Sequence, residues 1–157
     1  MLRCYDSVFL MGFCLVHYRI LHYAIYTDDQ KLFNSIITRV THCKWLNIQN
    51  NQLQSPLHLA VIQNQPHNVR RLVSWGASID LRDKHGNTPL HLACDRLRVE
   101  CVIALTTHLG RSDVKEVPYK VPFQRMPQNM DLLNYSGSYF VEFSYILFIM
   151  FFPCQTG

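Results

Sequence analysis

Hydrophobic residues in the middle of the chain recur at steps of three and four, which is the spacing of one face of an α-helix. They do so in Asn68–Trp75 and in Val99–Leu109. Two shorter runs, Pro56–Ala60 and Pro89–Ala93, each follow a serine or threonine. Because a hydroxyl residue is a favoured helix N-cap and proline fits the first helical turn, each run is predicted to begin a helix. The pattern therefore predicts four helices in two pairs.

The two pairs are copies of one unit. Ser55 and Thr88 are 33 residues apart, and Pro-Leu-His-Leu-Ala follows each of them. Farther along the same register, Val69 matches Val102. A 33-residue period with this motif is the sequence signature of an ankyrin repeat, which consists of a β-turn and two antiparallel helices. Since a catalytic motif has no reason to recur at a fixed period, the motif is interpreted as scaffolding.

Weaker copies flank the two clear ones. Arg19–Ile25 and Lys31–Val40 fit a degenerate first repeat, and Asn134–Ser144 begins a fourth. We predict an all-α ankyrin-repeat solenoid of helix-turn-helix repeats with β-turn fingers, about three repeats plus a partial fourth. The predicted units are an apolar N-terminal segment (1–17), repeat 1 (18–49), repeat 2 (50–82), repeat 3 (83–110), an inserted loop (111–131) and a partial repeat 4 with an apolar tail (132–157).

The remaining motif residues also have structural explanations. The leucine after each proline is predicted to face the neighbouring repeat, and the alanine three positions later keeps the first helix thin. His58 and His91 are predicted to hydrogen-bond to an adjacent cap or turn rather than to act as ligands. Gly76 and Gly110 are predicted to end the second helices in the left-handed conformation that glycine adopts easily.

Composition and charge add little to this picture. The chain is 48% hydrophobic and 17% charged, with a formal net charge of +4. The basic excess lies between Arg19 and Gly110, but no run of Lys and Arg is longer than two residues. A solvated surface explains this distribution better than a nucleic-acid footprint does. We therefore expect no direct nucleic-acid partner.

The chain carries no recognisable chemical site. Its six cysteines include no CxxC pair, so they are interpreted as reduced thiols in a cytosolic protein, with no metal and no other cofactor. GxSxG, HExxH and a phosphate-binding glycine loop are all absent, and Cys94 beside His91 has a packing explanation. No catalytic residue is predicted, and an enzyme is the least supported class.

Both ends of the chain are apolar. Val8–Val16 is long enough for the hydrophobic part of a signal peptide, but Asp6 precedes it and no small-residue cleavage site follows. Phe143–Phe152 has a similar length. Because both runs are shorter than the span of a bilayer, we expect no membrane association.

Specific stretches of the repeats resemble a known family. Leu46–Pro66 and Leu81–Cys94 are similar to the second and third ankyrin repeats of the IκB family, the Cactus-like inhibitors of Rel/NF-κB transcription factors. The long insertion before "LLNYSG" resembles the extended connection between the family's third and fourth repeats. The resemblance runs from about Arg19 to Ser144.

This resemblance implies a binding protein that holds a Rel dimer in the cytoplasm, with the nucleus as a second compartment, and covers the nuclear localisation segment. Asp28 and Asp29 suit such a basic segment, because paired carboxylates attract Lys and Arg. The implied contact surface combines the first-helix face of repeats 1 and 2 with two turn tips. Its predicted residues are Tyr26, Asp28, Asp29, Gln49, Asn50, Asn51, Gln52, Gln63, Asn64, Arg82, Asp83, Lys84 and His85.

The chain also departs from the family pattern. Met1–His17 contains no counterpart of the paired phosphorylated serines that mark family members for destruction, and the later repeats and the acidic tail have no counterpart. The resemblance therefore implies a truncated, constitutive inhibitor. A generic ankyrin adaptor for another protein partner is the alternative.

Overall fold

The computed structural model describes residues 20–110, 117–121 and 134–137. The regular structure of these residues is helical. After helical residues 20–26 come α2 (Gln30–Ile37), the 3-10 helix η1 (Cys43–Asn47), α3 (Pro56–Ile62), α4 (Pro66–Ser74), α5 (Pro89–Asp95) and α6 (Val99–Thr106).

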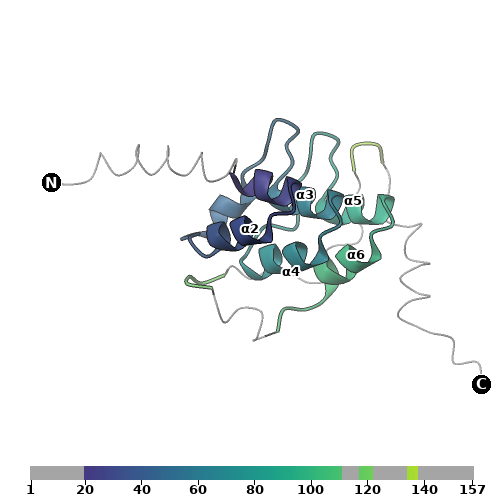
Figure 1. Cartoon of the computed structure of the whole chain (residues 1–157). Helices are drawn as coiled ribbons and strands as arrows, with labels where there is room; N and C mark the ends of the chain where they lie inside the picture. The colour runs from purple at the N-terminus through teal and green to yellow at the C-terminus, as the bar shows by residue number, and fades with distance from the viewer. Residues whose placement is uncertain (1–19, 111–116, 122–133, 138–157) are drawn as a thin grey trace, which may run out of the picture.

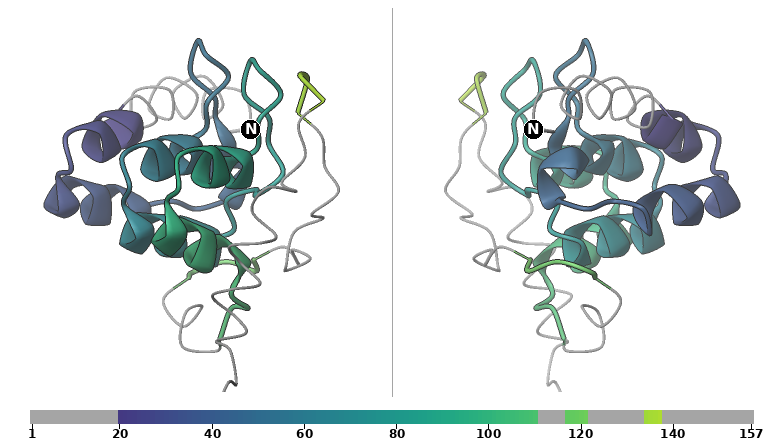
Figure 2. Two further views of the ribbon diagram at one scale, coloured as in Figure 1. Left: turned by 90° about the vertical axis from the view of Figure 1, so that its right-hand side faces the viewer. Right: turned by 90° about the vertical axis from the view of Figure 1, so that its left-hand side faces the viewer.

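The helices form two stacked layers. Within a repeat, α3 packs on α4 and α5 packs on α6, while between repeats α3 packs on α5 and α4 on α6. Three loops rise side by side from the stack, before α3, before α5 and at residues 134–137 (Figure 1). Both side views place these loops beyond the same edge of the helices (Figure 2). The predicted pairs of helices with projecting turns are thus observed.

The core lies between the two helical layers. Leu21, Leu57 and Leu90 occupy the same place in three repeats, and at most 1% of each is exposed. The alanine three residues after each leucine is completely buried. Burial of a leucine contributes about 2 kcal/mol of hydrophobic free energy, and alanine lets the paired helices approach closely. The degenerate first repeat therefore contributes to the core as the two clear repeats do.

A histidine closes the N-terminal cap of α3 and of α5. The backbone N–H of Ser55 donates to His58 Nδ1 at 3.2 Å, and that of Thr88 donates to His91 Nδ1 at 3.1 Å. His58 Nε2 also lies 3.1 Å from the carbonyl oxygen of Asn87, in the loop before the next first helix. Histidine thus replaces the glutamate of the usual capping box and links two repeats. The prediction that His58 hydrogen-bonds to an adjacent turn is confirmed.

This network determines the protonation state of His58. Because Nδ1 accepts the Ser55 N–H, the ring proton resides on Nε2, which donates to Asn87. The ring is fully buried, and burial lowers the pKa of His58 from its ordinary value of 6.5, although the Asn87 carbonyl opposes this shift. His58 is therefore a neutral structural residue at physiological pH.

The second helices end in two different ways. Gly76 follows α4 with φ = +85°, as the sequence predicted. By contrast, α6 ends with Thr107 in an extended conformation, so the prediction that Gly110 terminates this helix was wrong. The Arg70 guanidinium, from α4, donates to the carbonyl oxygens of Thr107 at 2.6 Å and His108 at 2.7 Å. Its Nη1 also lies 3.5 Å from the carbonyl oxygen of Ala104, in the last turn of α6, so a side chain from the preceding repeat contacts the carbonyl oxygens at and just beyond the end of this helix.

The extra residues between repeats 1 and 2 form η1. His42 caps it, since the N–H of Lys44 donates to His42 Nδ1 at 3.1 Å. Leu46 is completely buried, and Asn47 Oδ1 accepts the N–H of Ser78 at 2.7 Å. The insertion is thus packed into the stack, against α3.

The connections between paired helices share one conformation. Asp28, Asn64 and Leu97 stand at the same place in three repeats, with φ of 54°, 56° and 56°. Asp and Asn tolerate this left-handed region, whereas leucine is strained there. Leu97 is also 63% exposed, so burial of its side chain does little to compensate for the strain.

We therefore expect Leu97→Asn to raise the free energy of unfolding by about 0.5–1 kcal/mol. Urea denaturation followed by circular dichroism measures the change. Ile103→Asn is the control, because Ile103 is 42% exposed but lies on the helical backbone of α6. Equal effects of the two substitutions would show that polarity, and not backbone conformation, is responsible.

Candidate partner-binding surface

The three projecting loops are called finger 2 (residues 48–54), finger 3 (residues 81–87) and finger 4 (residues 134–137). One polar side chain shapes each of the first two. Asn50 Oδ1 accepts the backbone N–H groups of Gln52 and Gln54, both at 2.9 Å. The Asp83 carboxylate accepts two N–H groups of finger 3 in the same way, also at 2.9 Å. Asn50 and Asp83 are therefore committed to the shape of their own fingers.

Hydrogen bonds also join the fingers to one another. The N–H of Lys84 donates to the carbonyl oxygen of Gln52 at 3.1 Å. Gln49 Nε2 donates to the carbonyl oxygens of Leu53 and Arg82, the latter at 2.7 Å. The three fingers continue as a row in space (Figure 2). Fingers 2 and 3 thus present their tips in a fixed relative position.

The predicted finger residues fall into two groups. Gln49, Asn50, Arg82 and Asp83 each make hydrogen bonds within or between fingers. The side chains exposed at the tips, by contrast, are those of Asn51, Gln52, Lys84 and His85. The exposed group is the part of the predicted finger surface that a partner can contact directly.

The other predicted residues lie at the opposite end of the first helices. Tyr26 is 69% exposed, and Gln63 is the exposed C-cap of α3. Asn64 Oδ1 accepts the thiol of Cys101 at 3.7 Å. Since finger 2 precedes α3 and Gln63 follows it, the length of this helix, about 10 Å, separates the two groups.

The two aspartates differ in their surroundings. Asp29 caps α2, accepting the N–H of Leu32 at 2.9 Å. Asp28 is exposed, and its Oδ1 accepts a hydrogen bond from the exposed side chain of Gln30 at 2.9 Å. Asp28 is therefore the more available carboxylate for a basic partner.

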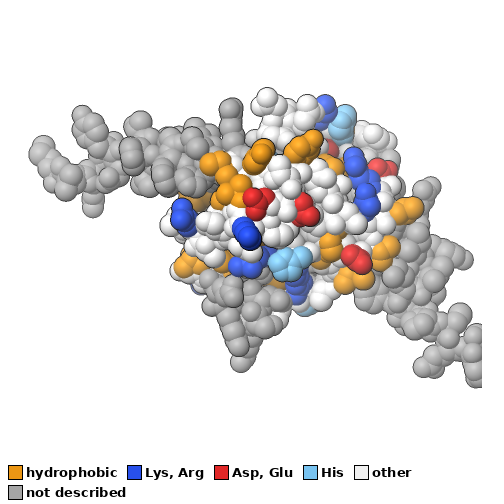
Figure 3. Space-filling view, in the orientation of Figure 1, with side chains coloured by type: hydrophobic (Ala, Val, Ile, Leu, Met, Phe, Trp, Pro, Cys, Tyr) orange, Lys and Arg blue, Asp and Glu red, His pale blue; other side chains and the backbone are white. Residues whose placement is uncertain are grey.

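An apolar face connects the two groups of predicted residues. Tyr23 is 61% exposed, and it lies one helical turn before Tyr26. Leu59 and Ile62, at the corresponding places in repeat 2, are partly buried. Hydrophobic side chains gather over the first helices in Figure 3, with acidic side chains beside them. Our sequence reasoning missed Tyr23, although its spacing of three residues from Tyr26 was a usable signal.

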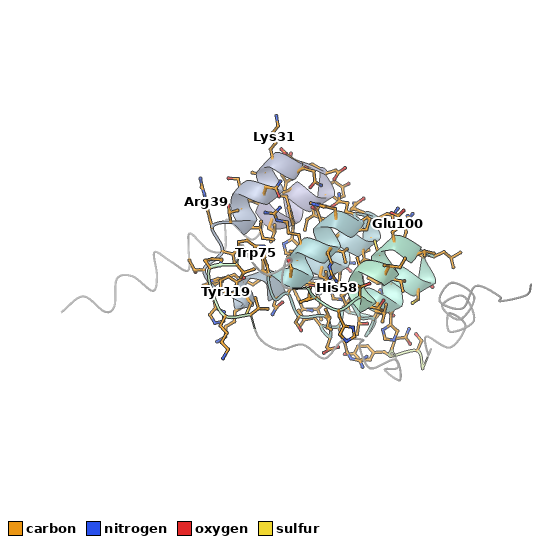
Figure 4. All side chains as sticks on the ribbon, turned by 90° about the horizontal axis from the view of Figure 1, so that it is seen from below. Lys31, Arg39, His58, Trp75, Glu100 and Tyr119 are labelled. Carbon is orange, nitrogen blue, oxygen red and sulfur yellow. The ribbon has the colours of Figure 1, made fainter. Side chains whose placement is uncertain are left out.

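Part of the predicted inserted loop folds back on the array. The hydroxyl of Tyr119 donates to the carbonyl oxygen of Trp75 at 2.7 Å, and the two rings meet edge to face with centroids 6.2 Å apart. The Tyr119 ring also stacks on His42 at 6.3 Å. Trp75 and Tyr119 lie next to each other in Figure 4. Burial raises the pKa of Tyr119, so its hydroxyl remains a donor.

The residues that the structure describes show few features of a metal site, a reactive cysteine or a membrane-spanning helix. No group of three or more His, Cys, Asp or Glu residues there could hold a metal ion. Burial raises the pKa of the Cys94 thiol to about 12, which makes it a poor nucleophile at neutral pH. None of the described helices has the length and hydrophobicity needed to cross a membrane.

Gly86 is the contact point between fingers 3 and 4. Its φ is +80°, and a Cβ at this position would lie 2.6 Å from Tyr135 Cδ1 and 2.7 Å from the Tyr135 nitrogen. Gly137 has a similar φ of +72°, but open space surrounds it. The two glycines thus share the left-handed backbone conformation.

We expect Gly86→Ala to lower the free energy of unfolding by about 2 kcal/mol and Gly137→Ala by about 1 kcal/mol. Both alanines are strained at positive φ, but only the first also displaces finger 4. Denaturation by urea compares the two variants. Equal losses would mean that the Tyr135 contact contributes nothing to stability.

Comparison with known proteins identifies the repeats. A family model described as ankyrin repeats (3 copies) matches residues 18–116. The chain belongs to the ankyrin-repeat family. The predicted all-α ankyrin-repeat solenoid is therefore confirmed. This ankyrin-repeat protein is similar to the crystal structure of the ankyrin repeat domain of Bcl-3, which is described as a unique member of the IκB family. The TM-score is 0.59 and the sequence identity is 28%. The match covers 87% of this chain and 52% of the Bcl-3 chain.

Several curated relatives are NF-κB inhibitors, which confirms the predicted resemblance of this ankyrin-repeat protein to the IκB family. NF-κB inhibitor alpha of Sus scrofa is 41% identical over 98 residues, which cover 62% of this chain and 31% of the relative. NF-κB inhibitor alpha of Homo sapiens is 46% identical over 87 residues, which cover 55% of this chain and 27% of the relative. Human NF-κB inhibitor epsilon is 53% identical over 60 residues, covering 38% and 12%. The chain thus spans less than a third of the length of these relatives.

Some predictions remain untested. The boundaries of the six predicted units stay predictions, as do the roles of the thirteen surface residues. Most of residues 111–131 and of the partial repeat 4, and both apolar ends, lie outside the described residues.

Proposed function

We propose that this protein is an IκB-like inhibitor that binds Rel/NF-κB transcription factors and retains them in the cytoplasm. The observation that carries this proposal is the 46% identity to human NF-κB inhibitor alpha over 87 residues. The binding partner is the Rel homology domain together with its nuclear localisation segment.

The shape of the array supports binding. Repeat arrays bind proteins through extended surfaces built on a rigid stack. Here the finger tips carry exposed polar side chains, and the first helices add the exposed rings of Tyr23 and Tyr26. Exposed tyrosine is a frequent anchor in protein interfaces, because it buries a large area at a small cost in conformational entropy.

The charge of the inter-helix loop supports recognition of a basic segment. Asp28 is exposed at the turn of repeat 1, immediately before the capping carboxylate of Asp29 and two residues after the ring of Tyr26. A lysine or arginine of the localisation segment can pair with Asp28 and also pack on the aromatic face. Asp29 contributes mainly through its field, since it already caps α2.

Binding to a purified Rel homology domain dimer tests the proposal. Isothermal titration calorimetry is expected to give a dissociation constant below 1 μM, which corresponds to about 8 kcal/mol. Asp28→Asn keeps the shape and the left-handed tolerance of the residue but removes its charge. We expect this variant to bind about fivefold more weakly, because a partly exposed ion pair contributes about 1 kcal/mol.

Glu100→Gln is the matched control. Glu100 is exposed on α6, in the other helical layer, and the substitution removes the same charge. Glu100→Gln is expected to leave the dissociation constant unchanged. A Rel dimer that lacks its localisation segment is expected to bind the wild-type protein and Asp28→Asn with equal affinity. A folded chain, shown helical by circular dichroism, that fails to bind Rel at micromolar concentration would contradict the proposal and favour the generic adaptor.

A further inference from the structure

Tyr135 presents an exposed phenol on a fixed backbone. Its side chain is 72% exposed at the tip of finger 4. Its backbone N–H donates to the carbonyl oxygen of His85 at 3.2 Å, and the neighbouring Asn134 Nδ2 donates to Asn87 Oδ1 at 3.0 Å. The base of the ring rests against Gly86, where no Cβ intervenes. The hydroxyl end is thus accessible while the backbone is anchored to finger 3.

A cation lies beside this ring. The guanidinium carbon of Arg82 lies 6.0 Å from the ring centroid, and Arg82 is itself held by a bond to the carbonyl oxygen of Gly86 at 2.8 Å. Lys84 and His85 are exposed at the tip of the same finger. The Asp83 carboxylate is turned inward onto backbone N–H groups. Among the described residues, Asp80 is the acidic residue that precedes this finger in the chain.

Tyr135 differs from the other tyrosines that the structure describes. Tyr23 and Tyr26 are exposed but lie on helical residues 20–26, whose backbone cannot enter a kinase cleft without unfolding. The Tyr119 hydroxyl is occupied by the carbonyl oxygen of Trp75. Only Tyr135, among these described tyrosines, combines an exposed ring, a turn and neighbouring cations. Loop tips of this kind are the most accessible sites for modifying enzymes.

We infer that Tyr135 is a phosphorylation site for a tyrosine kinase, and that finger 3 receives the phosphate through Arg82 and Lys84. In this step the phenolic oxygen attacks the γ-phosphorus of ATP. The bond from that phosphorus to the β,γ-bridging oxygen breaks, ADP leaves, and the phenolic proton passes to the base of the kinase. The product is a phosphate monoester that carries nearly two negative charges at neutral pH.

The phosphate changes fingers 3 and 4 in two ways. Charge-assisted hydrogen bonds to the guanidinium and the ammonium tie finger 4 to finger 3 more firmly. The tips of the two fingers change from basic to acidic, so their preference for a charged partner is reversed. This inference goes beyond the proposed function, because it holds whether the partner is a Rel protein or another protein.

Phosphorylation of the full chain by a soluble tyrosine kinase domain with ATP tests the site. Tandem mass spectrometry is expected to show Tyr135 modified at least tenfold faster than Tyr23, Tyr26 or Tyr119. In ³¹P NMR, the second pKa of the phosphate is expected to lie about half a unit below that of a free phosphopeptide of the same sequence, because cations favour the dianion.

Two variants separate the roles of the cations. Arg82→Gln is expected to reduce this shift by about half, and so is Lys84→Gln, which is at an exposed position and leaves the Gly86 bond intact. Lys31→Gln, on α2, is the control and is expected to retain the full shift. Modification of Tyr135 no faster than of Tyr23 and Tyr26 would overturn the site. A phosphate pKa equal to that of the peptide would overturn the role of finger 3.

Discussion

Replacing Leu57 with alanine is expected to lower the free energy of unfolding by about 3 kcal/mol, the largest effect of any single substitution considered. Leu57 is completely buried, and it lies on α3, which packs against α4, α5 and η1. Truncation leaves a cavity at the junction of three elements. Because a repeat array is stabilised by its nearest-neighbour interfaces, this cavity weakens the coupling between repeats 1, 2 and 3.

Urea denaturation followed by circular dichroism at 222 nm measures this loss. Ile103→Ala is the control, because it removes a similar volume from a side chain of α6 that is 42% exposed, and it is expected to cost less than about 1 kcal/mol. If Leu57→Ala cost no more than the control, α3 could not lie at the centre of the stack. The repeat arrangement, and the surface built on it, would then be wrong.

Replacing His58 with alanine is expected to cost about 2–3 kcal/mol. The imidazole is fully buried, and it holds the backbone N–H of Ser55 on one side and the carbonyl oxygen of Asn87 on the other. Its removal leaves both groups without this partner and removes one of the links between finger 3 and repeat 2. His67→Ala is the control, since His67 is exposed on α4 and is expected to change stability by less than about 0.5 kcal/mol.

The same residue is expected to make stability depend on pH. The pKa of His58 is lower in the folded protein than its ordinary value of 6.5, so the unfolded chain binds a proton more readily. The contribution of His58 is complete above pH 6.5 and is lost as the pH falls below that value. Urea titrations at pH 7.5 and pH 5.5 measure the loss. A loss of the same size in His58→Ala would assign it to another group.

The separation of fingers and inter-helix loops affects how a partner must bind. A short segment contacts only one group, whereas a folded domain with an attached arm can contact both. Asp28 lies in the loop group and Lys84 in the finger group, so their opposite charges suit different parts of the partner. The combination of a folded domain and a basic tail in the proposed Rel partner fits this division.

The candidate surface could be only partly predicted from sequence. Turn residues such as Asn50 and Asp83 are polar and stand at predicted loop tips, so they resemble contact residues. In the folded protein they accept backbone N–H groups of their own fingers. Sequence cannot separate a turn-forming carboxylate from a partner-binding one, because both require the same residue type at the same place.

The sequence by itself determined the repeat. A 33-residue period, a hydroxyl cap before proline and buried leucine and alanine at fixed offsets are local signals, because each acts within a few residues of the chain. These signals were sufficient for the helix pairs, for the Gly76 terminator and for the family. They also anticipated the bond from His58 to the next turn, since the repeat brings that turn into reach.

Only the tertiary structure decided what lies between distant segments. Arg70 closes the end of α6 in place of Gly110, Tyr119 folds back onto Trp75, and Tyr135 rests on Gly86. Each of these contacts joins residues more than 30 positions apart along the chain. Such contacts depend on which segments the stacked repeats place side by side. They also depend on which donors and acceptors remain unpaired at those places. A local sequence pattern encodes neither property.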